Sequence, residues 1–172
     1  MAQQQISTAF FFGLTVLLVG TMGMSACQPE EAASGGDPMA PAALPSTATS
    51  KDFGDYVLHF NAQRTDQLTS EIAAEYGIAR SKNRAMLTVS IIKKADASPG
   101  ISVSGAVSAS ATNLTGQLKN LTLKEIREGS AIYYVAETPV AHSETLIFSI
   151  DATPINETSR FSVRYKKQFF AD

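Results

Sequence analysis

The sequence predicts one all-β domain, a single antiparallel β-sandwich with one short helix, preceded by a signal peptide and a flexible linker. Three observations lead to this fold class. From residue 51 onward, apolar and polar residues alternate with a period of two in several short runs. Turn-forming residues separate these runs at fairly regular spacing, which is typical of a sandwich. With one cysteine in 172 residues, no intramolecular disulfide is possible, so packing and strand pairing must hold the domain together.

The N-terminal segment is apolar and uncharged. Residues 1–29 contain no Asp, Glu, Lys or Arg, and the most apolar part, residues 9–20, has the length of the hydrophobic region of a signal peptide. The whole uncharged stretch of residues 6–26 is also long enough to span a bilayer. A cleaved secretory signal, an uncleaved anchor helix and a lipoprotein signal therefore compete.

The residues before the cysteine favour the lipoprotein signal. The chain reads Met24-Ser25-Ala26-Cys27, which resembles a bacterial lipobox with Met in the position of Leu, whereas Met is too large for an ordinary secretory cleavage site. In such signals the cysteine thiol receives a diacylglycerol, the chain is cut before it, and the new amino group is acylated, which anchors the protein stably. We therefore expect residues 1–26 to be a lipoprotein signal peptide and Cys27 to be lipidated. A plain anchor helix and a small buried cysteine are the alternatives.

The residue after the cysteine indicates which membrane holds the anchor. Lipoproteins that stay in the inner membrane of Gram-negative bacteria typically have Asp at this position, and this chain has Gln28. By that analogy we expect the lipid on Cys27 to hold the protein at the outer membrane, facing the periplasm.

Residues 27–50 are expected to be the lipidated cysteine and a flexible tether. Residues 28–50 are rich in Pro, Ala, Ser and Gly and contain no aromatic residue, so they cannot bury enough surface to offset their ordering entropy. Fully extended, they would reach about 70 Å at ~3.3 Å per residue. The β-sandwich domain is expected to cover residues 51–172.

The alternation of the domain predicts its strands. In the first strand, Tyr56, Leu58 and Phe60 share one face. Where two aromatic residues are adjacent, alternation buries one and exposes the other, so Tyr134 and Phe170 are candidates for an outer face. The expected strands are residues 53–63, 86–94, 101–111, 121–126, 132–137, 145–152 and 160–170.

One helix is expected at residues 70–76. Thr69 or Ser70 can cap its N-terminus, and Gly77 fits the stop at its C-terminus. Ile72 is expected to share a face with Ala73 and Tyr76 at helical spacing. Because two turns are marginal in isolation, this helix must dock on the sandwich.

Five segments of the domain carry a family resemblance. They are, in order, GDYVLHFNA (54–62), YGIARSKNRAMLTVSI (76–91), NLTGQ (113–117), REGSAIYYVAE (127–137) and VRYKKQFFAD (163–172). Together they resemble an uncharacterised family of bacterial lipoproteins, domain-of-unknown-function family 4426, from about residue 52 to residue 172. The resemblance implies an immunoglobulin-like β-sandwich, export and no established activity, and it supplies no catalytic residues.

A basic loop between the helix and the second strand is the candidate binding site. Three cations and an asparagine within five residues can bind an anion through charge, amide and backbone N–H groups. The structural alternative is that the two arginines pair with acids of the sandwich or that an arginine caps helix carbonyls. The candidate residues are Arg80, Lys82, Asn83 and Arg84 and, if the first strand runs beside the loop, Asn61 and Tyr56.

The chain has no motif for catalysis, for a metal or for a cofactor. The only histidines, His59 and His142, lack nearby Cys or closely spaced acids, and His59 is expected on the solvent face. The Gly-x-Ser-x-Gly pattern of hydrolases is absent, and lipidation would consume Cys27. A formal net charge of -2 and a pI of about 5.7 argue against a bulk nucleic-acid binder. We expect no enzyme activity and no cofactor.

These features predict a lipid-anchored envelope lipoprotein that displays a non-catalytic binding or adaptor domain toward the periplasm. Its expected partners are the membrane, through the anchor, and an envelope protein or an anionic glycan. One alternative is a weak hydrolase or transferase whose residues converge only in the fold. Another is a periplasmic protein held by a single N-terminal membrane helix.

Overall fold

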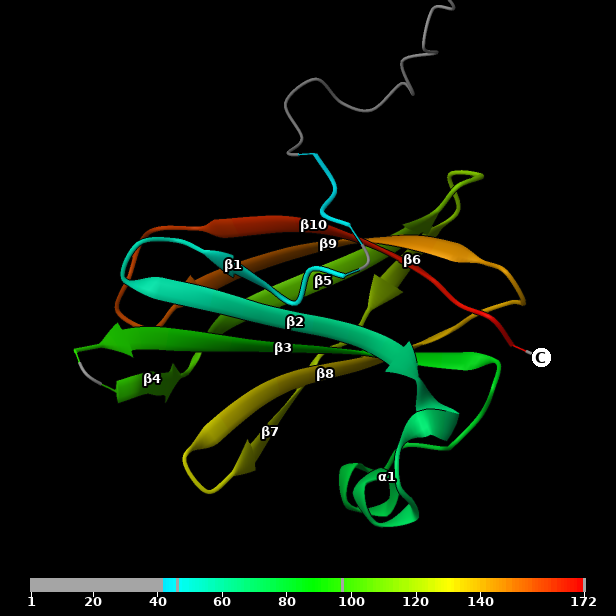
Figure 1. Cartoon of the computed structure of the whole chain (residues 1–172), viewed down its shortest axis with the longest axis horizontal. Coiled ribbons are helices and arrows are strands. Elements are labelled where there is room, and N and C mark those ends of the chain that lie inside the picture. The colour runs from blue at the N-terminus through cyan, green and yellow to red at the C-terminus, as the bar shows by residue number, and fades with distance from the viewer. Residues whose placement is uncertain (1–41, 46, 97, 172) are drawn as a thin grey trace, which may run out of the picture. The chain divides into compact units, whose positions relative to one another are not determined.

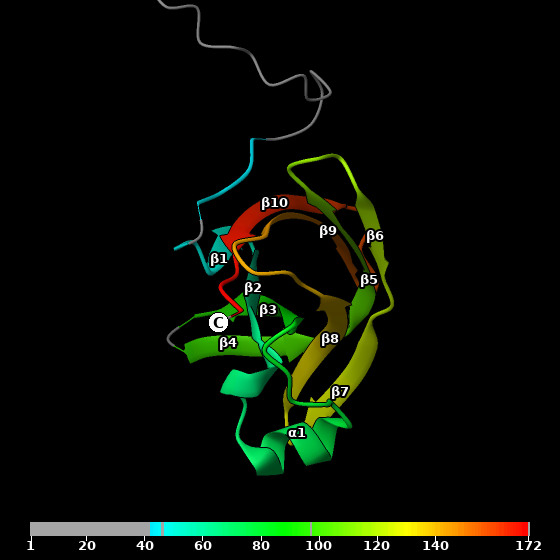
Figure 2. The same ribbon diagram turned by 90° about the vertical axis from the view of Figure 1, so that its right-hand side faces the viewer.

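The computed structural model describes residues 42–45, 47–96 and 98–171, whose strands form two antiparallel sheets that pack as a sandwich (Figure 1 and Figure 2). The first sheet has the order β1-β2-β3-β8-β7, with β4 also pairing with β3, and the second has the order β10-β9-β5-β6. The expected all-β sandwich with one short helix is confirmed. The strands are β1 (Ser50–Asp52), β2 (Tyr56–Arg64), β3 (Arg84–Ala95), β4 (Ser98–Val103), β5 (Gly105–Asn113), β6 (Leu118–Leu121), β7 (Lys124–Glu128), β8 (Ala131–Pro139), β9 (Thr145–Pro154) and β10 (Phe161–Gln168).

The expected signal peptide and Cys27 lie outside the described residues. Within residues 42–45, 47–96 and 98–171, no helix combines the length and the apolar character needed to cross a membrane.

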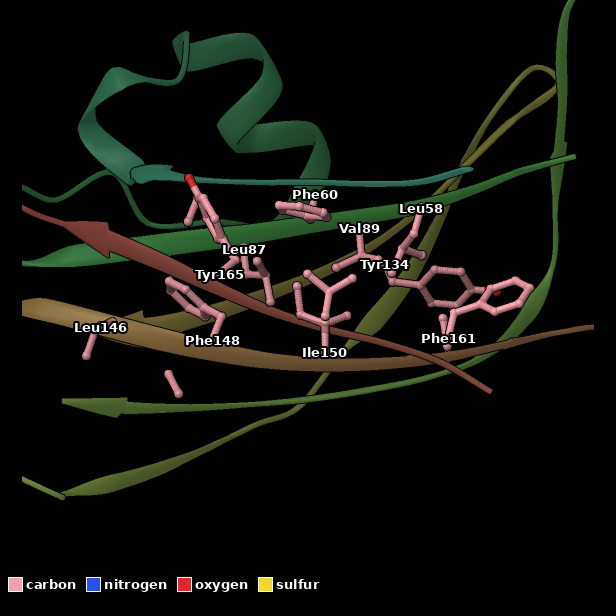
Figure 3. Close-up of a cluster of buried hydrophobic side chains, with 14 of the residues drawn as sticks. Leu58, Phe60, Leu87, Val89, Tyr134, Leu146, Phe148, Ile150, Phe161 and Tyr165 are labelled. Atoms are coloured by element: carbon pink, nitrogen blue, oxygen red, sulfur yellow. The ribbon is translucent and has the colours of Figure 1, made fainter. Parts of the chain in front are cut away.

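A hydrophobic core fills the space between the sheets (Figure 3). On β2, Tyr56, Leu58 and Phe60 point inward as predicted, and His59 and Asn61 are exposed on the other face. Full burial of one large aliphatic or aromatic side chain stabilises the fold by about 1.5–3 kcal/mol. The largest fully buried core side chains are Tyr165, Phe148, Leu58, Leu87, Ile91, Leu146, Ile150, Val89 and Val163.

Helix α1 (Ser70–Tyr76) begins and ends where the sequence predicts. The Thr69 hydroxyl accepts a hydrogen bond from the Ile72 N–H at 3.3 Å, and Gly77 ends the helix in the left-handed conformation at φ 66°. The helix packs on the outer face of the first sheet, opposite the core (Figure 2). The expectation that Ile72 shares the buried face is wrong, because the helix docks through its Ala73 side and leaves Ile72 40% exposed. The buried members of this second cluster are Leu68, Ala73, Ile78, Met86 and Val135.

Two of the expected strands are each two strands that belong to different sheets. Segment 101–111 divides into β4 of the first sheet and β5 of the second sheet. Segment 121–126 divides into the end of β6, in the second sheet, and β7, in the first sheet. At the first crossing the backbone passes so close to β9 that a Cβ on Gly105 would lie 2.4 Å from the Thr153 carbonyl oxygen. The single-strand expectation is wrong because the alternation continues through the crossing, with Val103 and Val107 both packed against the core.

Tyr134 is buried, contrary to the expectation of an outer face. Its ring lies in the core (Figure 3), and its hydroxyl accepts a hydrogen bond from the Gly105 N–H at 2.8 Å. The neighbouring Tyr133 takes the outer face and contacts the cluster beneath α1. Phe170 is exposed, as expected.

An extended segment covers one edge of the sandwich. The Leu44 N–H donates to the Arg164 carbonyl at 2.6 Å, and the Leu44 carbonyl accepts from the Lys166 N–H at 3.1 Å, in parallel pairing with β10. Farther along, β1 pairs with β2. Part of the segment expected to be tether therefore contacts the domain, because Leu44 and Ala48 pack against the core.

Candidate binding groove

A groove lies between the end of β2 and the segment that follows β10. Its volume is about 630 Å³, which is within the range of small-ligand sites. In Figure 1 the C-terminal segment runs from β10 toward the end of β2. Ala62 and Phe169 are its buried residues, and Phe170 adds an exposed ring. This edge groove is lined by Asn61, Ala62, Gln63, Arg64, Gln67, Lys167, Gln168, Phe169 and Phe170.

Arg64 ties the two walls of the edge groove together. Its Nη1 donates a hydrogen bond to the Phe170 carbonyl, and its Nε lies 3.1 Å from Asp66 Oδ1. Phe169 is held independently, since its N–H donates to the Glu144 carbonyl at 2.9 Å. The groove is therefore built from two backbone segments that are fastened to the sandwich.

A mostly buried ion pair supports the C-terminal wall. The Lys119 Nζ lies 2.8 Å from Glu144 Oε1, the Ala141 N–H donates to Oε2 at 2.9 Å, and Asn113 donates at 3.3 Å. Burial raises the pKa of the Glu144 carboxyl, but the hydrogen bonds from Lys119, Ala141 and Asn113 outweigh this effect and hold the pKa below its usual value. The Glu144 carbonyl also accepts the hydrogen bond from the Phe169 N–H, so the residue that forms the ion pair also holds the groove wall in place.

The side chains that line the edge groove are mainly amides and cations. Asn61, Gln63 and Gln67 make no side-chain hydrogen bond with another described residue, and Lys167 forms no ion pair with one. Asp66 balances the charge of Arg64, so Lys167 gives this part of the described surface its net positive charge. Amides and a cation suit a ligand that carries carbonyl groups and an anionic group.

The basic loop lies beside the edge groove, and its arginines are tied into the fold. Arg80 Nη2 donates to the Asp66 carbonyl at 2.8 Å, and Arg84 Nη1 lies 3.2 Å from Glu137 Oε2. Arg84 therefore pairs with an acid of the sandwich, as the structural alternative expects, and Arg80 binds a carbonyl of the 3-10 helix Thr65–Gln67. Anion binding by the loop stays a prediction. Lys82 and Asn83 are exposed.

Buried Thr65 connects the loop to the groove. Its hydroxyl donates to the Ala79 carbonyl at 2.9 Å and accepts from the Ser81 N–H at 2.9 Å. Thr65 begins the short 3-10 helix Thr65–Gln67, whose last residue lines the edge groove. The loop and the groove therefore lie at the same end of the sandwich.

Of the two predicted neighbours of the loop, the structure brings only Asn61 to this end. Asn61 lines the edge groove. Tyr56 pairs with Lys93, nine positions along β3 from Arg84, which corresponds to about 30 Å at ~3.3 Å per residue. Tyr56 is buried, and its hydroxyl donates to Glu157 Oε1 at 2.8 Å, so it is not part of this surface.

The two histidines do not form a joint site. His59 lines a shallow hollow of about 210 Å³ on the outer face of the first sheet, with Ser90 and Tyr133 among its other walls. His142 lies against the ring of Phe170, with 6.3 Å between ring centroids. In the part of the chain that the structure describes, no three His, Cys, Asp or Glu side chains are grouped so as to hold a metal ion.

Sequence reasoning missed most of the edge groove. Gln63, Arg64 and Gln67 are far in the chain from Lys167 and Gln168, and only the strand order brings them together. The available signals were the polar residues on the outer face of β2 and a pair of lysines near the C-terminus. Neither signal indicates which strand edges meet.

Comparisons with known proteins agree with the fold. A family model described as a domain of unknown function, DUF4426, matches residues 50–172. The chain is also similar to a solved structure, the crystal structure of a DUF4426 family protein from Pseudomonas aeruginosa PAO1. The two are 30% identical with a TM-score of 0.62, over 72% of this chain and 94% of that chain. No curated protein matches.

Proposed function

The chain belongs to the DUF4426 family of domains of unknown function, and we propose that it is a lipid-anchored, non-catalytic binding protein of the cell envelope. Its binding site is the edge groove. One observation carries the proposal. The groove combines a partly apolar lining with the amides of Asn61, Gln63 and Gln67, which make no side-chain hydrogen bond with a described residue, and with a lysine that has no ion-pair partner among those residues. Such groups recognise a ligand, but they include no nucleophile paired with a base.

The anchor half of the proposal rests on the sequence around Cys27. A lipid on Cys27 would hold the protein at the outer membrane, facing the periplasm, with residues 28–43 as the spacer before Leu44. Extended at ~3.3 Å per residue, this spacer reaches about 50 Å. That reach suits a domain that meets a partner in the envelope, either a protein or an anionic glycan.

Replacing the cysteine tests the anchor. We expect Cys27→Ser to change the apparent mass, to that of an unprocessed precursor, because an acylated and cleaved N-terminus can no longer form. Gln28→Ser is the matched control and should keep the mature mass and the membrane fraction. If Cys27→Ser also pellets with membranes at an unchanged mass, residues 6–26 are an uncleaved helix and the lipid anchor is wrong.

Capture in living cells tests the binding site. A photo-crosslinking amino acid in place of Gln67 lies in the edge groove, and the same amino acid in place of Ser108 lies on an exposed position of β5 on the outer face of the second sheet. We expect a discrete product from Gln67 and none from Ser108. The chemical class of the captured molecule then separates an envelope protein from an anionic glycan. An identical product from both positions, or none from Gln67, would contradict a binding role for the groove.

A further inference from the structure

The edge of β2 that borders the groove is only partly covered. β1 pairs with residues 57–59, and the Phe60 N–H donates to the Thr49 carbonyl at 2.9 Å. Beyond Phe60, none of the described strands pairs with this side of β2. Main-chain groups of successive residues point to opposite sides of a strand, so the Phe60 bond indicates that the Ala62 carbonyl and the Arg64 N–H point to the uncovered side.

The chain itself shows that this side of the sandwich accepts an extended segment. Residues 44–45 and 47–52 run along it, with Leu44 bonded to β10 and β1 bonded to β2 (Figure 1). The end of β2, residues 61–64, and the end of β10 with the two residues that follow it, residues 167–170, form the walls of the edge groove. A further extended segment would therefore meet strand edges of the kind that Leu44 and β1 already use.

The charge of the groove specifies an acidic ligand. On β10, Val163 and Tyr165 are buried toward the core, so alternation turns Lys167 to the same side and the exposed Lys166 to the outer face. Lys167 is half-buried and lines the groove without an ion-pair partner among the described residues. A ligand carboxylate would complete this pair.

We propose that the edge groove binds an extended segment of a partner polypeptide, which adds a short strand to β2 beyond β1 and sets a carboxylate against Lys167. This inference deepens the proposed function and rests on it. The open part of β2, residues 61–64, spans about 13 Å at ~3.3 Å per residue, so a segment of about four residues fills it. Main-chain hydrogen bonds supply the affinity, and the alternating side chains supply the specificity.

A peptide library tests the proposal on the full chain in detergent micelles. The probes are immobilised pentapeptides with blocked ends, with Glu or Gln at the centre and Thr, Val, Ser or Tyr elsewhere. We expect retention of Glu-centred members at least about 5-fold above their Gln twins, which corresponds to about 1 kcal/mol. N-methylation of alternate peptide nitrogens should abolish retention, because it removes the donors of strand pairing.

Two lysine variants give the matched comparison. Lys167→Gln should remove the preference for Glu, and Lys166→Gln, the same loss of charge on the opposite face of β10, should keep it. Both variants should unfold at the wild-type temperature. Equal behaviour of the two variants overturns the role of Lys167, and retention that survives N-methylation overturns strand addition.

The proposal also fails if no pentapeptide is retained. If polygalacturonate, an anionic polysaccharide, is then retained and Lys167→Gln releases it, the occupant is a glycan. None of these results changes what crosslinking from Gln67 in cells would show. The peptide assay can therefore contradict strand addition while the crosslinking experiment still supports a binding function for the groove.

Discussion

Replacing Tyr134 by Phe removes one hydroxyl group from the point where the chain crosses between the two sheets. This hydroxyl accepts from the Gly105 N–H at 2.8 Å, and the Gly105 carbonyl and Glu125 Oε2 lie within donor reach at 2.9 Å and 3.0 Å. Phe keeps the ring packing but leaves the Gly105 N–H, at the start of β5, without this partner. A main-chain group that loses its partner away from solvent costs about 1–3 kcal/mol. We therefore expect the free energy of unfolding to fall by about 2 kcal/mol.

Urea titration followed by circular dichroism measures this loss, and thermal unfolding provides a second measurement. At about 2.1 cal/mol/K per residue, the entropy of unfolding of residues 50–172 is about 0.25 kcal/mol/K, so 2 kcal/mol lowers the Tm by about 8 °C. The matched control is Tyr133→Phe, because the Tyr133 hydroxyl makes no hydrogen bond with a described residue. The free energy of unfolding of this variant should fall by less than about 0.5 kcal/mol. Equal losses in the two variants would refute the role of the crossing hydrogen bonds.

Two further predictions concern the frame around the groove. In the same urea titration, Gly105→Ala should lower the free energy of unfolding by at least about 2 kcal/mol. The new Cβ would lie 2.4 Å from the Thr153 carbonyl oxygen and 3.0 Å from Pro154 Cα, both of which are backbone atoms. Unchanged stability would show that β9 can move away. The fold holds the Glu144 pKa below its usual 4.5, so its contribution is complete above the unfolded pKa and is lost as the pH falls through the folded value. Glu144→Gln should therefore destabilise the protein at pH 7. The difference in unfolding free energy between this variant and wild type should shrink as the pH falls below the usual 4.5 of a Glu carboxyl. A difference that is constant with pH would contradict the ion pair with Lys119.

The elements that sequence reasoning predicts are those with local signals. The β2 alternation identifies its buried face, and Thr69 and Gly77 mark the ends of α1. The crossing from β4 to β5 has no such signal, because Val103 and Val107 keep the period of two on either side of Gly105. Alternation shows which side of a strand is buried, but not which sheet the strand joins.

The edge groove depends on topology, which the local pattern does not contain. Its walls meet because β10 ends one sheet and only β1, a short strand, lies outside β2 in the other. The loop cations can be recognised from the sequence, but their partners cannot, since Asp66 belongs to the 3-10 helix Thr65–Gln67 and Glu137 to β8. Likewise, two adjacent lysines are visible in the sequence, and the buried Tyr165 before them determines which one faces the groove.

Capture from Gln67 in cells that carry a charge reversal tests the central claim most directly. Lys167→Glu reverses the charge inside the edge groove, and Lys166→Glu makes the same change on the outer face of β10. If the groove binds an acidic partner, Lys167→Glu should reduce the product at least about 10-fold, equivalent to about 1.4 kcal/mol, while Lys166→Glu leaves it unchanged. Equal capture in the two strains, at the wild-type level, would show that the partner does not enter the groove.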